Sequence, residues 1–199
     1  MQQMGKRIFD LFFSLTGLLA LAPILLLLGL LIKLESKGPV FYLQTRVGRY
    51  GRDFKLFKFR TMFPDSDKKG LITVGMKDPR ITKIGYILRR YKLDELPQLI
   101  NVLYGNMSFV GPRPEVRKYV DMYSTSELSV LAVKPGITDL ASLTYINENE
   151  ILAQASDPEI TYLNEVMPHK LALNMEYIRK SSLWFDIKII FRTILKIVN

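Results

Sequence analysis

Two adjacent carboxylates, Asp94 and Glu95, open the stretch DELPQLINVLYG. Acidic side chains are common in the first turn of a helix, where they cap free N–H groups and face the positive end of the helix dipole. A helix cap is therefore one interpretation of the pair. The other is chemical. Neighbouring side chains point in different directions around a helix, so one carboxylate can attack an electrophile while the other holds a divalent cation.

Basic side chains crowd the sequence before this pair. Residues 33–92 contain 16 Lys and Arg against 5 Asp and Glu, and the whole chain carries a formal net charge of +9. Such an excess suits a polyanion, whether nucleic acid, anionic lipid or a phosphate-rich small molecule. Each basic residue taken singly also fits a solvated surface charge. The candidate phosphate-binding residues are Lys58, Arg60, Arg89, Arg90 and Arg113.

Arg113 stands out among these residues because it lies between Pro112 and Pro114. The two prolines restrict the backbone, and a guanidinium on a fixed backbone is suited to bidentate phosphate contact.

The chain has no cysteine, which excludes disulfides and thiol chemistry. A single histidine, His169, argues against a zinc site, whereas a hard metal held by carboxylates stays compatible with the sequence.

A membrane segment lies near the N-terminus, where residues 11–32 contain no charged side chain. A secretory signal is excluded because Pro23 follows the cleavage-like Ala20–Ala22 and the apolar run continues past it. Pro23 predicts a kink, since proline lacks the N–H group and its ring clashes with a carbonyl one turn earlier. Basic residues flank both ends, which favours a helix-break-helix that enters and leaves on one face. A slightly kinked spanning helix is the alternative.

The C-terminal stretch SLWFDIKIIFRTILKIVN is a second candidate membrane element. Lys188, Arg192 and Lys196 recur every fourth residue, and aromatic and aliphatic residues fill the rest. Such a pattern is typical of a helix that lies in a membrane interface. A helix packed on a soluble core is the alternative, and the N-terminal segment favours the membrane interpretation.

The sequence between these two elements predicts one compact domain. Val40–Met62 reads as a β-hairpin with a turn at Gly48–Gly51. The other expected elements are a loop over FPDSDKKG, helices over Ile81–Tyr91 and from Asp94 to near Gly105, an extended VGPRPE, a turn at KPGITD, and a helix over Glu159–Arg179 with a break at Pro168. The expected fold is α/β but mostly helical, with a membrane segment at 1–36 and one domain at 37–199.

Several motifs together make the sequence recognisable: KRIFDL, the proline inside the apolar segment, FKFRTM, LRRYKLDELPQLINVLYGNMSFVGPRP, KPGIT and LWFDIKII. With them, nearly the whole chain resembles the bacterial sugar transferases, the monotopic phosphoglycosyl transferases that begin membrane glycoconjugate assembly. The chain departs from the pattern in two places. It reads PGITDLASLTYINENE where many members read PGITGWAQVNG, and it has Asn174 where many carry an aspartate. These departures leave the sugar open.

The resemblance implies a two-step transfer. Asp94 attacks the β-phosphate of a nucleotide sugar, usually a UDP-sugar, releases UMP and holds the phosphosugar until polyprenol phosphate accepts it. Glu95 is implied to help bind Mg²⁺. Lys58, Arg89 and Arg113 are implied to hold phosphates, and Asp186 to support the site. Arg60 joins these residues from the candidates above.

The resemblance also implies a location and a set of partners. The apolar segment bent at Pro23 is re-entrant, and the domain lies on the cytoplasmic face of the bacterial inner membrane. Nucleotide sugar, polyprenol phosphate and membrane lipid are the expected partners, nucleic acid is not one of them, and a homodimer is compatible with the sequence. The alternative is a non-catalytic, membrane-tethered protein that binds nucleic acid or anionic lipid, for which Asp94 and Glu95 would be dispensable.

Overall fold

The computed structural model describes residues 2–64, 66, 78–145 and 147–198. Helices predominate, as expected, and the strands form two small two-stranded sheets. The strands and α-helices are α1 (Gln2–Glu35), β1 (Phe41–Val47), β2 (Asp53–Phe59), α2 (Lys83–Arg90), α3 (Gln98–Tyr104), β3 (Ser108–Val110), α4 (Arg117–Val120), β4 (Gly136–Thr138), α5 (Leu140–Thr144), α6 (Glu148–Gln154), α7 (Pro158–Thr161), α8 (Met167–Lys180) and α9 (Leu183–Val198). Four further helical turns are η1 (Arg49–Gly51), η3 (Leu93–Glu95), η4 (Glu127–Ala132) and η5 (Tyr162–Val166).

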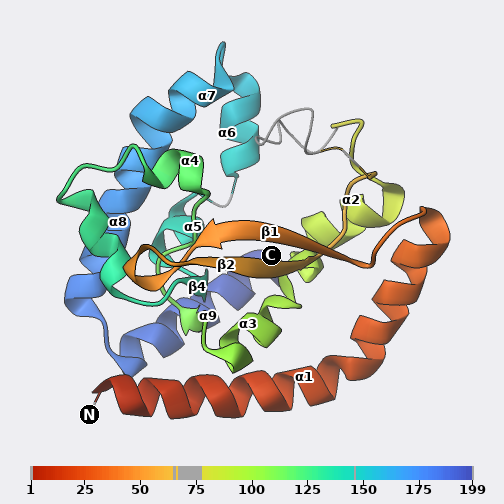
Figure 1. The fold of residues 1–199 in the computed structure, drawn as a ribbon, viewed down its shortest axis with the longest axis horizontal. Helices are drawn as coiled ribbons and strands as arrows, with labels where there is room; N and C mark the ends of the chain where they lie inside the picture. Colours follow the sequence, from red (N-terminus) through yellow and green to blue (C-terminus); the bar gives the residue numbers. More distant parts are fainter. Residues whose placement is uncertain (1, 65, 67–77, 146, 199) are drawn as a thin grey trace.

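The N-terminal helix α1 is long and apolar enough to cross a membrane by length and composition. It is one continuous helix with Pro23 inside, so the expected break is instead a bend, visible in Figure 1. A proline removes one helical hydrogen bond and displaces a carbonyl, which bends a helix without ending it. Most apolar side chains of α1, such as Leu19 and Leu26, are exposed on the protein.

Both ends of α1 contact the rest of the molecule. At the start, the Lys6 ammonium donates to the Val110 carbonyl (2.9 Å) and pairs with Asp186 of α9. At the end, the Glu35 carboxylate accepts from the backbone N–H groups of Lys83 (2.7 Å) and Ile84 (3.0 Å) at the start of α2. Both ends of helix α1 are therefore held by the folded domain, and the helix packs against α3 between them.

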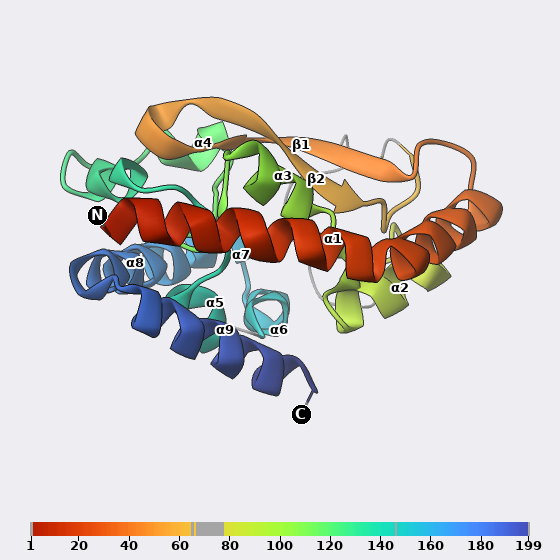
Figure 2. The same cartoon turned by 90° about the horizontal axis from the view of Figure 1, so that it is seen from below.

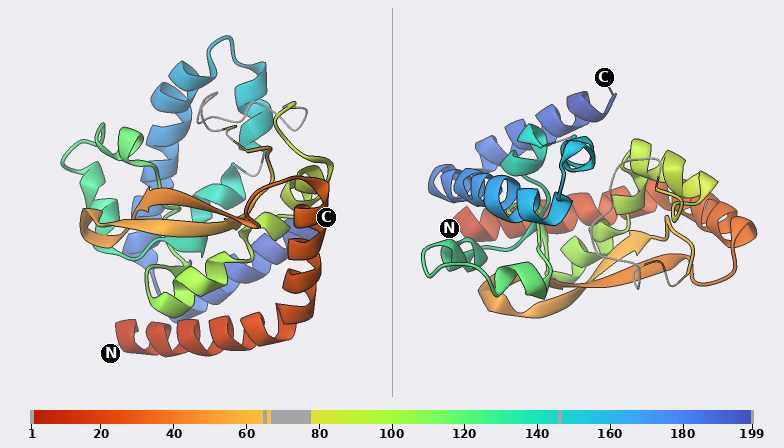
Figure 3. Two further views of the ribbon diagram at one scale, coloured as in Figure 1. Left: turned by 45° about the vertical axis from the view of Figure 1, so that its right-hand side comes forward. Right: turned by 90° about the horizontal axis from the view of Figure 1, so that it is seen from above.

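The predicted hairpin is confirmed by strands β1 and β2, which pair antiparallel from Phe41 opposite Phe59 to Val47 opposite Asp53. Aromatic and β-branched residues favour these strands. The turn between them contains Tyr50 and Gly51, both with positive φ. The hairpin lies across the domain above α3 (Figures 1 and 3). The loop expected at FPDSDKKG lies mostly outside the described residues.

The second sheet pairs β3 with β4 in parallel, Ser108 opposite Gly136 and Val110 opposite Thr138. The prediction of a turn at KPGITD was therefore wrong, because its central residues, Gly136–Thr138, form a strand. Three residues are too few to show the alternation that identifies a strand, and the partner lies more than 20 residues away. The two backbones approach closely at Gly111, where a Cβ on Gly136 would collide with it.

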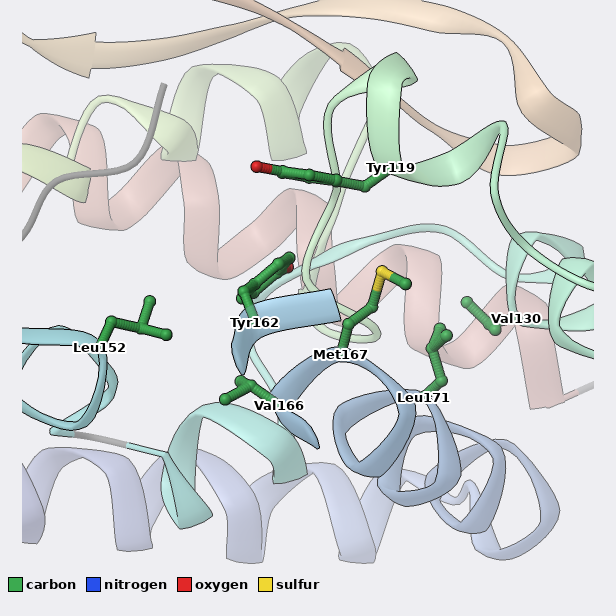
Figure 4. Packing of buried hydrophobic residues seen from close by; sticks show 7 residues of the cluster. All are labelled: Tyr119, Val130, Leu152, Tyr162, Val166, Met167 and Leu171. Atoms are coloured by element: carbon green, nitrogen blue, oxygen red, sulfur yellow. The ribbon is translucent and has the colours of Figure 1, made fainter. Parts of the chain in front are cut away.

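The helical region expected over Glu159–Arg179 is present as α7, the π-helical turn η5 and α8. The irregularity is the π turn just before Pro168, since a proline cannot donate the helical bond there. Figure 4 shows Tyr162, Met167 and Leu171 projecting from this region into a cluster with Tyr119. This cluster is one of four that form the core of the described chain.

The C-terminal helix α9 lies beside the first half of α1 on one face of the molecule (Figure 2). The Lys6–Asp186 ion pair joins the two helices. Trp184, Phe191 and Ile194 of α9 are exposed. The two elements that the sequence assigned to the membrane are therefore neighbours in the fold.

Candidate active site

The carboxylate pair lies in the single 3₁₀ turn η3 and not in an α-helix, so the prediction of a helix beginning at Asp94 was wrong. Lys92 before the turn has a positive φ of 55°, and α3 begins only at Gln98, with Pro97 as its N-cap. Pro97 has no N–H group to donate to the Leu93 carbonyl, so the turn closes with shorter bonds, such as Leu96 N–H to the same carbonyl (3.3 Å). The end of this helix at Gly105 agrees with the prediction.

The Glu95 carboxylate is held by two cations. Arg113 donates to both of its oxygens, through Nη1 to Oε2 (3.2 Å) and through Nη2 to Oε1. Lys58 of β2 donates to Oε1 at 3.0 Å. Burial alone would raise the pKa of Glu95, but the charges of Arg113 and Lys58 hold this pKa well below its usual range. Glu95 is therefore ionised and firmly oriented.

The Asp94 carboxylate has a different environment. The residue is only 7% exposed, yet within the part of the chain that the structure describes its side chain forms no hydrogen bond or ion pair. Burial raises the pKa of Asp94, while the charge of Lys58 lowers it. The two neighbours thus differ: Glu95 is neutralised by direct partners, and Asp94 keeps an oxygen free for a reaction.

Arg89 lies near Asp94 at the end of α2. Its Nε donates to the Thr61 hydroxyl at 2.9 Å, which fixes the guanidinium. Burial lowers the pKa of Arg89, and the charge of Asp94 opposes this effect most strongly. Lys58, Arg89 and Arg113 therefore surround the two carboxylates with positive charge, and the structure brings five of the predicted site residues together.

Three contacts hold Arg113 and the two residues after it, and the sequence analysis did not predict the roles of Asp139 and Arg46 in them. The Arg113 backbone N–H donates to the Asp139 carboxylate (3.2 Å), and Arg46 donates to the Pro114 carbonyl (3.1 Å). Arg46 also pairs with Glu115 at 3.0 Å. Asp139 caps α5 as well, accepting from Ser142 N–H at 2.6 Å. The only sequence signal for Asp139 was its position as a polar residue after a glycine-containing turn.

The structure does not bring Arg60 or Asp186 to the carboxylate pair. Arg60 is buried and donates to the carbonyls of Lys37 (2.6 Å), Ser36 (2.8 Å) and Ile32 (3.3 Å), so it caps the end of α1. Asp186 is 2% exposed and is bound to Lys6 and to the Tyr177 hydroxyl (2.7 Å). Pro23 lies at the bend of α1. The contacts of Arg60 and Asp186 therefore connect elements of the fold to one another.

The chemistry of the donor set limits which metal could bind here. No group of three or more His, Cys, Asp or Glu side chains suited to a metal occurs within the described ranges. Asp94 and Glu95 nevertheless offer two neighbouring carboxylates. Mg²⁺ is commonly bound by one or two carboxylates together with substrate phosphates, so this set fits Mg²⁺ once a phosphate is bound.

Comparison with known proteins extends over the whole chain. The family described as "Bacterial sugar transferase" matches residues 1–199. The chain is 37% identical over 197 residues to the UDP-N-acetylgalactosamine-undecaprenyl-phosphate N-acetylgalactosaminephosphotransferase of Aeromonas hydrophila, covering 98% of this chain and 44% of that protein. It is 40% identical over 195 residues to the UDP-glucose:undecaprenyl-phosphate glucose-1-phosphate transferase of Escherichia coli (strain K12), covering 96% and 39%.

A shorter relative covers the chain almost end to end. The exopolysaccharide production protein PSS of Rhizobium leguminosarum bv. phaseoli is 39% identical over 203 residues, covering 95% of this chain and 92% of that protein. By contrast, the chain spans less than half the length of the first two relatives. The similarity therefore concerns a segment that occurs both alone and within longer proteins.

Proposed function

Because this chain belongs to the bacterial sugar transferase family, we propose that it transfers a phosphosugar from a UDP-sugar to polyprenol phosphate. The names of the relatives from Aeromonas hydrophila and Escherichia coli state that they act on UDP-sugars and undecaprenyl phosphate. The observation that carries the proposal is the contrast between a buried Asp94 without a partner among the described residues and a neighbouring Glu95 held by Lys58 and Arg113. A protein that only binds a polyanion has no need of such a carboxylate.

The reaction proceeds in two displacements. An Asp94 oxygen attacks the β-phosphorus of the UDP-sugar, the bond to the bridging oxygen breaks, and UMP leaves with that oxygen. The phosphosugar is then bound to Asp94 as an acyl phosphate. A phosphate oxygen of polyprenol phosphate attacks the same phosphorus, forms the diphosphate linkage and frees the carboxylate. Splitting one difficult transfer into two easier steps is the advantage of a covalent intermediate.

The basic residues stabilise the charge that this reaction moves. Arg89 and Lys58 face Asp94, and Arg113 reaches the site through Glu95. Fixed cations near a transferring phosphoryl group stabilise the transition state without reorganising during the reaction. The contacts to Thr61 and Asp139 hold two of these cations in position before substrate arrives.

We also propose that Mg²⁺ takes part and that Glu95 would help to hold it, together with phosphate oxygens of the substrate. Bound there, it would neutralise negative charge on the diphosphate. We expect excess chelator to abolish UMP release and added Mg²⁺ to restore it, as measured by coupled detection of UMP. Full activity in excess chelator would show that Lys58, Arg89 and Arg113 suffice without a metal.

The pH dependence follows from Asp94 and Lys58. Burial raises the pKa of Asp94 above the ordinary 3.8, so the attacking carboxylate is lost, as pH falls, at a higher pH than for an ordinary aspartate. Burial lowers the pKa of Lys58 below 10.5, although the charge of Glu95 opposes this effect. As pH rises, Lys58 therefore loses its charge at a lower pH than an ordinary lysine does. We expect a bell-shaped kcat/KM profile with both limbs displaced inward. Lys58→Arg should move only the basic limb upward, and an unchanged basic limb would contradict the role of Lys58.

We further propose that α1 is re-entrant and that the domain lies on the cytoplasmic face of the bacterial inner membrane. Lys6 and Glu35, at opposite ends of α1, both contact the same domain. A spanning helix would separate these ends by a hydrocarbon core of about 30 Å. The exposed apolar side chains of α1 and α9 lie on neighbouring helices and favour an apolar environment.

Removing the bend should change this topology. Pro23→Leu restores a helical hydrogen bond and removes a distortion of about 3 kcal/mol, which favours a straight, spanning helix. We expect a partial shift, because the Lys6–Asp186 pair resists movement of the N-terminus. The measurement is labelling of a Gly5→Cys variant by an impermeant thiol reagent in intact cells, and the chain has no other cysteine.

The wild-type background should label only after the cells are permeabilised, and Pro23→Leu should label partly before. Adding Lys6→Leu to Pro23→Leu should increase the labelled fraction, since it removes the ion pair. If the wild-type background labels fully in intact cells, α1 spans the membrane and the re-entrant proposal is wrong.

The function itself is tested with a panel of UDP-sugars, polyprenol phosphate and Mg²⁺, with UMP as the readout. We expect UMP and a polyprenyl-diphosphate sugar with at least one donor. Binding of anionic lipid or nucleic acid that weakens with salt, without UMP from any donor, would favour a membrane-tethered binding protein instead.

A further inference from the structure

A second concave site includes Arg113, which also binds Glu95. Its walls include Arg113, Tyr123, Tyr162, Met167, Lys170 and Asn174, and we call it the Asn174 pocket. It opens to solvent and has a free volume of about 20 Å³. A site for one water needs about 10–15 Å³. The Asn174 pocket therefore admits one substituent of a larger substrate, such as a single hydroxyl group.

The pocket contains a polar group without a partner. Asn174 is 5% exposed, and its amide oxygen has no hydrogen-bond partner within the described residues. A buried polar atom left unsatisfied costs about 1–3 kcal/mol. Two other polar groups of the wall are already engaged: Lys170 pairs with Glu148 at 2.8 Å, and the Tyr162 hydroxyl donates to Glu115. The Asn174 amide oxygen is the fully buried side-chain atom of this wall that lacks a partner among the described residues.

The wall combines polar and apolar groups. Met167 and Leu171 line it from α8, and Tyr162 contributes a ring from η5. Figure 4 shows these three side chains in the neighbouring core cluster. An amide next to apolar side chains suits a polyhydroxylated ring, which has hydroxyl groups at its edge and C–H groups on its face. A phosphate fits this amide oxygen poorly, because an ionised phosphate has no hydrogen to donate. A polyprenol chain fits poorly too, since it has no polar group to offer.

The pocket shares Arg113 with the carboxylate pair. Arg113 donates to both oxygens of Glu95, which adjoins Asp94 in the chain. In a UDP-sugar the sugar is bonded directly to the β-phosphorus, whereas the nucleoside lies beyond the α-phosphate. The part of the substrate nearest to the reacting phosphorus is therefore the sugar.

We propose that the Asn174 pocket binds the sugar of the donor and that Asn174 accepts a hydrogen bond from a sugar hydroxyl or N-acetyl N–H group. This inference rests on the proposed function for the identity of the donor. Asn174 selects among UDP-sugars, because a sugar that lacks the matching donor leaves the amide oxygen unpaired. Discrimination of this kind is strong at sites that hydrogen-bond one substituent.

The test compares binding of UDP-sugars with binding of UDP, by calorimetry on the full chain without Mg²⁺, so that the proposed transfer to Asp94 does not proceed. The variants are Asn174→Leu, which removes the amide at similar volume, Asn174→Ala, which removes it without overfilling the pocket, and Asn174→Asp, which keeps an acceptor. Asn164→Ala, at an exposed position of η5, is the matched control. Thermal unfolding of each variant checks the fold.

We expect one UDP-sugar to bind the wild type more tightly than UDP does, and Asn174→Leu and Asn174→Ala to lose about 10- to 100-fold of this advantage. Asn174→Asp and Asn164→Ala should retain it, and UDP should bind all variants equally. An equal loss for UDP and every UDP-sugar would show that the pocket binds the nucleoside, and would overturn the proposal. Unchanged binding of all ligands would show that only water occupies it.

Calorimetry also keeps this proposal separate from the proposed function. If the wild type binds a UDP-sugar but releases no UMP with polyprenol phosphate, the transfer reaction is wrong and the binding ratios still test the pocket. If UMP is released and the variants keep the donor preference of the wild type, the pocket proposal fails alone.

Discussion

Asp94→Asn is expected to lower UMP release by about 10⁴-fold or more, because the amide nitrogen is not a nucleophile and the neighbouring Glu95 is already bound by Lys58 and Arg113. The fold should survive the change. Burial raises the pKa of Asp94 in the folded protein above its ordinary value, so the ionised carboxylate destabilises the folded state at neutral pH. The neutral amide has nearly the same shape and removes this cost.

Two measurements decide this prediction. The initial rate of UMP release should fall to background in Asp94→Asn, and the Tm should equal or exceed that of the wild type. A variant that retains a tenth of the wild-type rate would sink the assignment of Asp94 as nucleophile. A variant that is inactive because it unfolds would show a lower Tm, so the two causes of inactivity are distinguishable.

Arg113→Leu is expected to lower kcat/KM for the UDP-sugar by about 10²–10³-fold, the usual effect of removing one preorganised donor that stabilises transition-state charge. Arg113 donates to both oxygens of Glu95 and is fixed by Asp139 through its backbone. Without it, Lys58 alone holds Glu95. Arg113→Lys keeps the charge but loses the bidentate geometry, so its rate should lie between those of the wild type and Arg113→Leu.

The matched control is Arg117→Leu, which removes an exposed arginine that pairs with Asp53 on the surface. Surface ion pairs contribute little, so this variant should stay within about twofold of the wild type. Steady-state kinetics with purified variants gives both values. If Arg113→Leu and Arg117→Leu lose activity equally, the effect of Arg113 is one of overall charge and not of its position beside Glu95.

Local sequence patterns predicted those parts of the fold that short-range forces determine. The hairpin of Phe41–Phe59 follows from aromatic and β-branched residues around a glycine turn. Helix α2 follows from apolar residues at helical spacing, with Thr82 as its cap. The bend at Pro23 follows from the missing N–H group of proline. Each of these signals lies within a few residues of the structure that it specifies.

The remaining features depend on partners far apart in the chain. The parallel pairing of β3 with β4 joins two three-residue strands, which are too short to show a pattern of their own. The 3₁₀ turn of Asp94 reflects a single missing donor at Pro97, where the acidic residues had suggested a cap. Here a specific backbone constraint outweighed the general preference for acids at helix starts.

In the candidate site, too, local signals predicted some residues, whereas others depend on partners far apart in the chain. The pair Asp94 and Glu95 and its neighbours Lys58, Arg89 and Arg113 were predicted from residue type and from motifs. Arg60 was not distinguished from them, because nothing in the sequence reveals that its donors cap α1. The contacts of Asp139 and Arg46 with the Arg113 segment, over 26 and 68 residues, likewise had no local signal.

The central claim is that Asp94 carries the phosphosugar, and intact-mass measurement tests it most directly. The chain is incubated with a UDP-sugar that supports turnover and with Mg²⁺, but without polyprenol phosphate, and then analysed whole. We predict a new species heavier by one sugar phosphate in the wild type, absent from Asp94→Asn, that disappears when polyprenol phosphate is added. A wild type that releases UMP in the complete reaction yet never gains this mass, or an Asp94→Asn variant that gains it equally, would contradict the account.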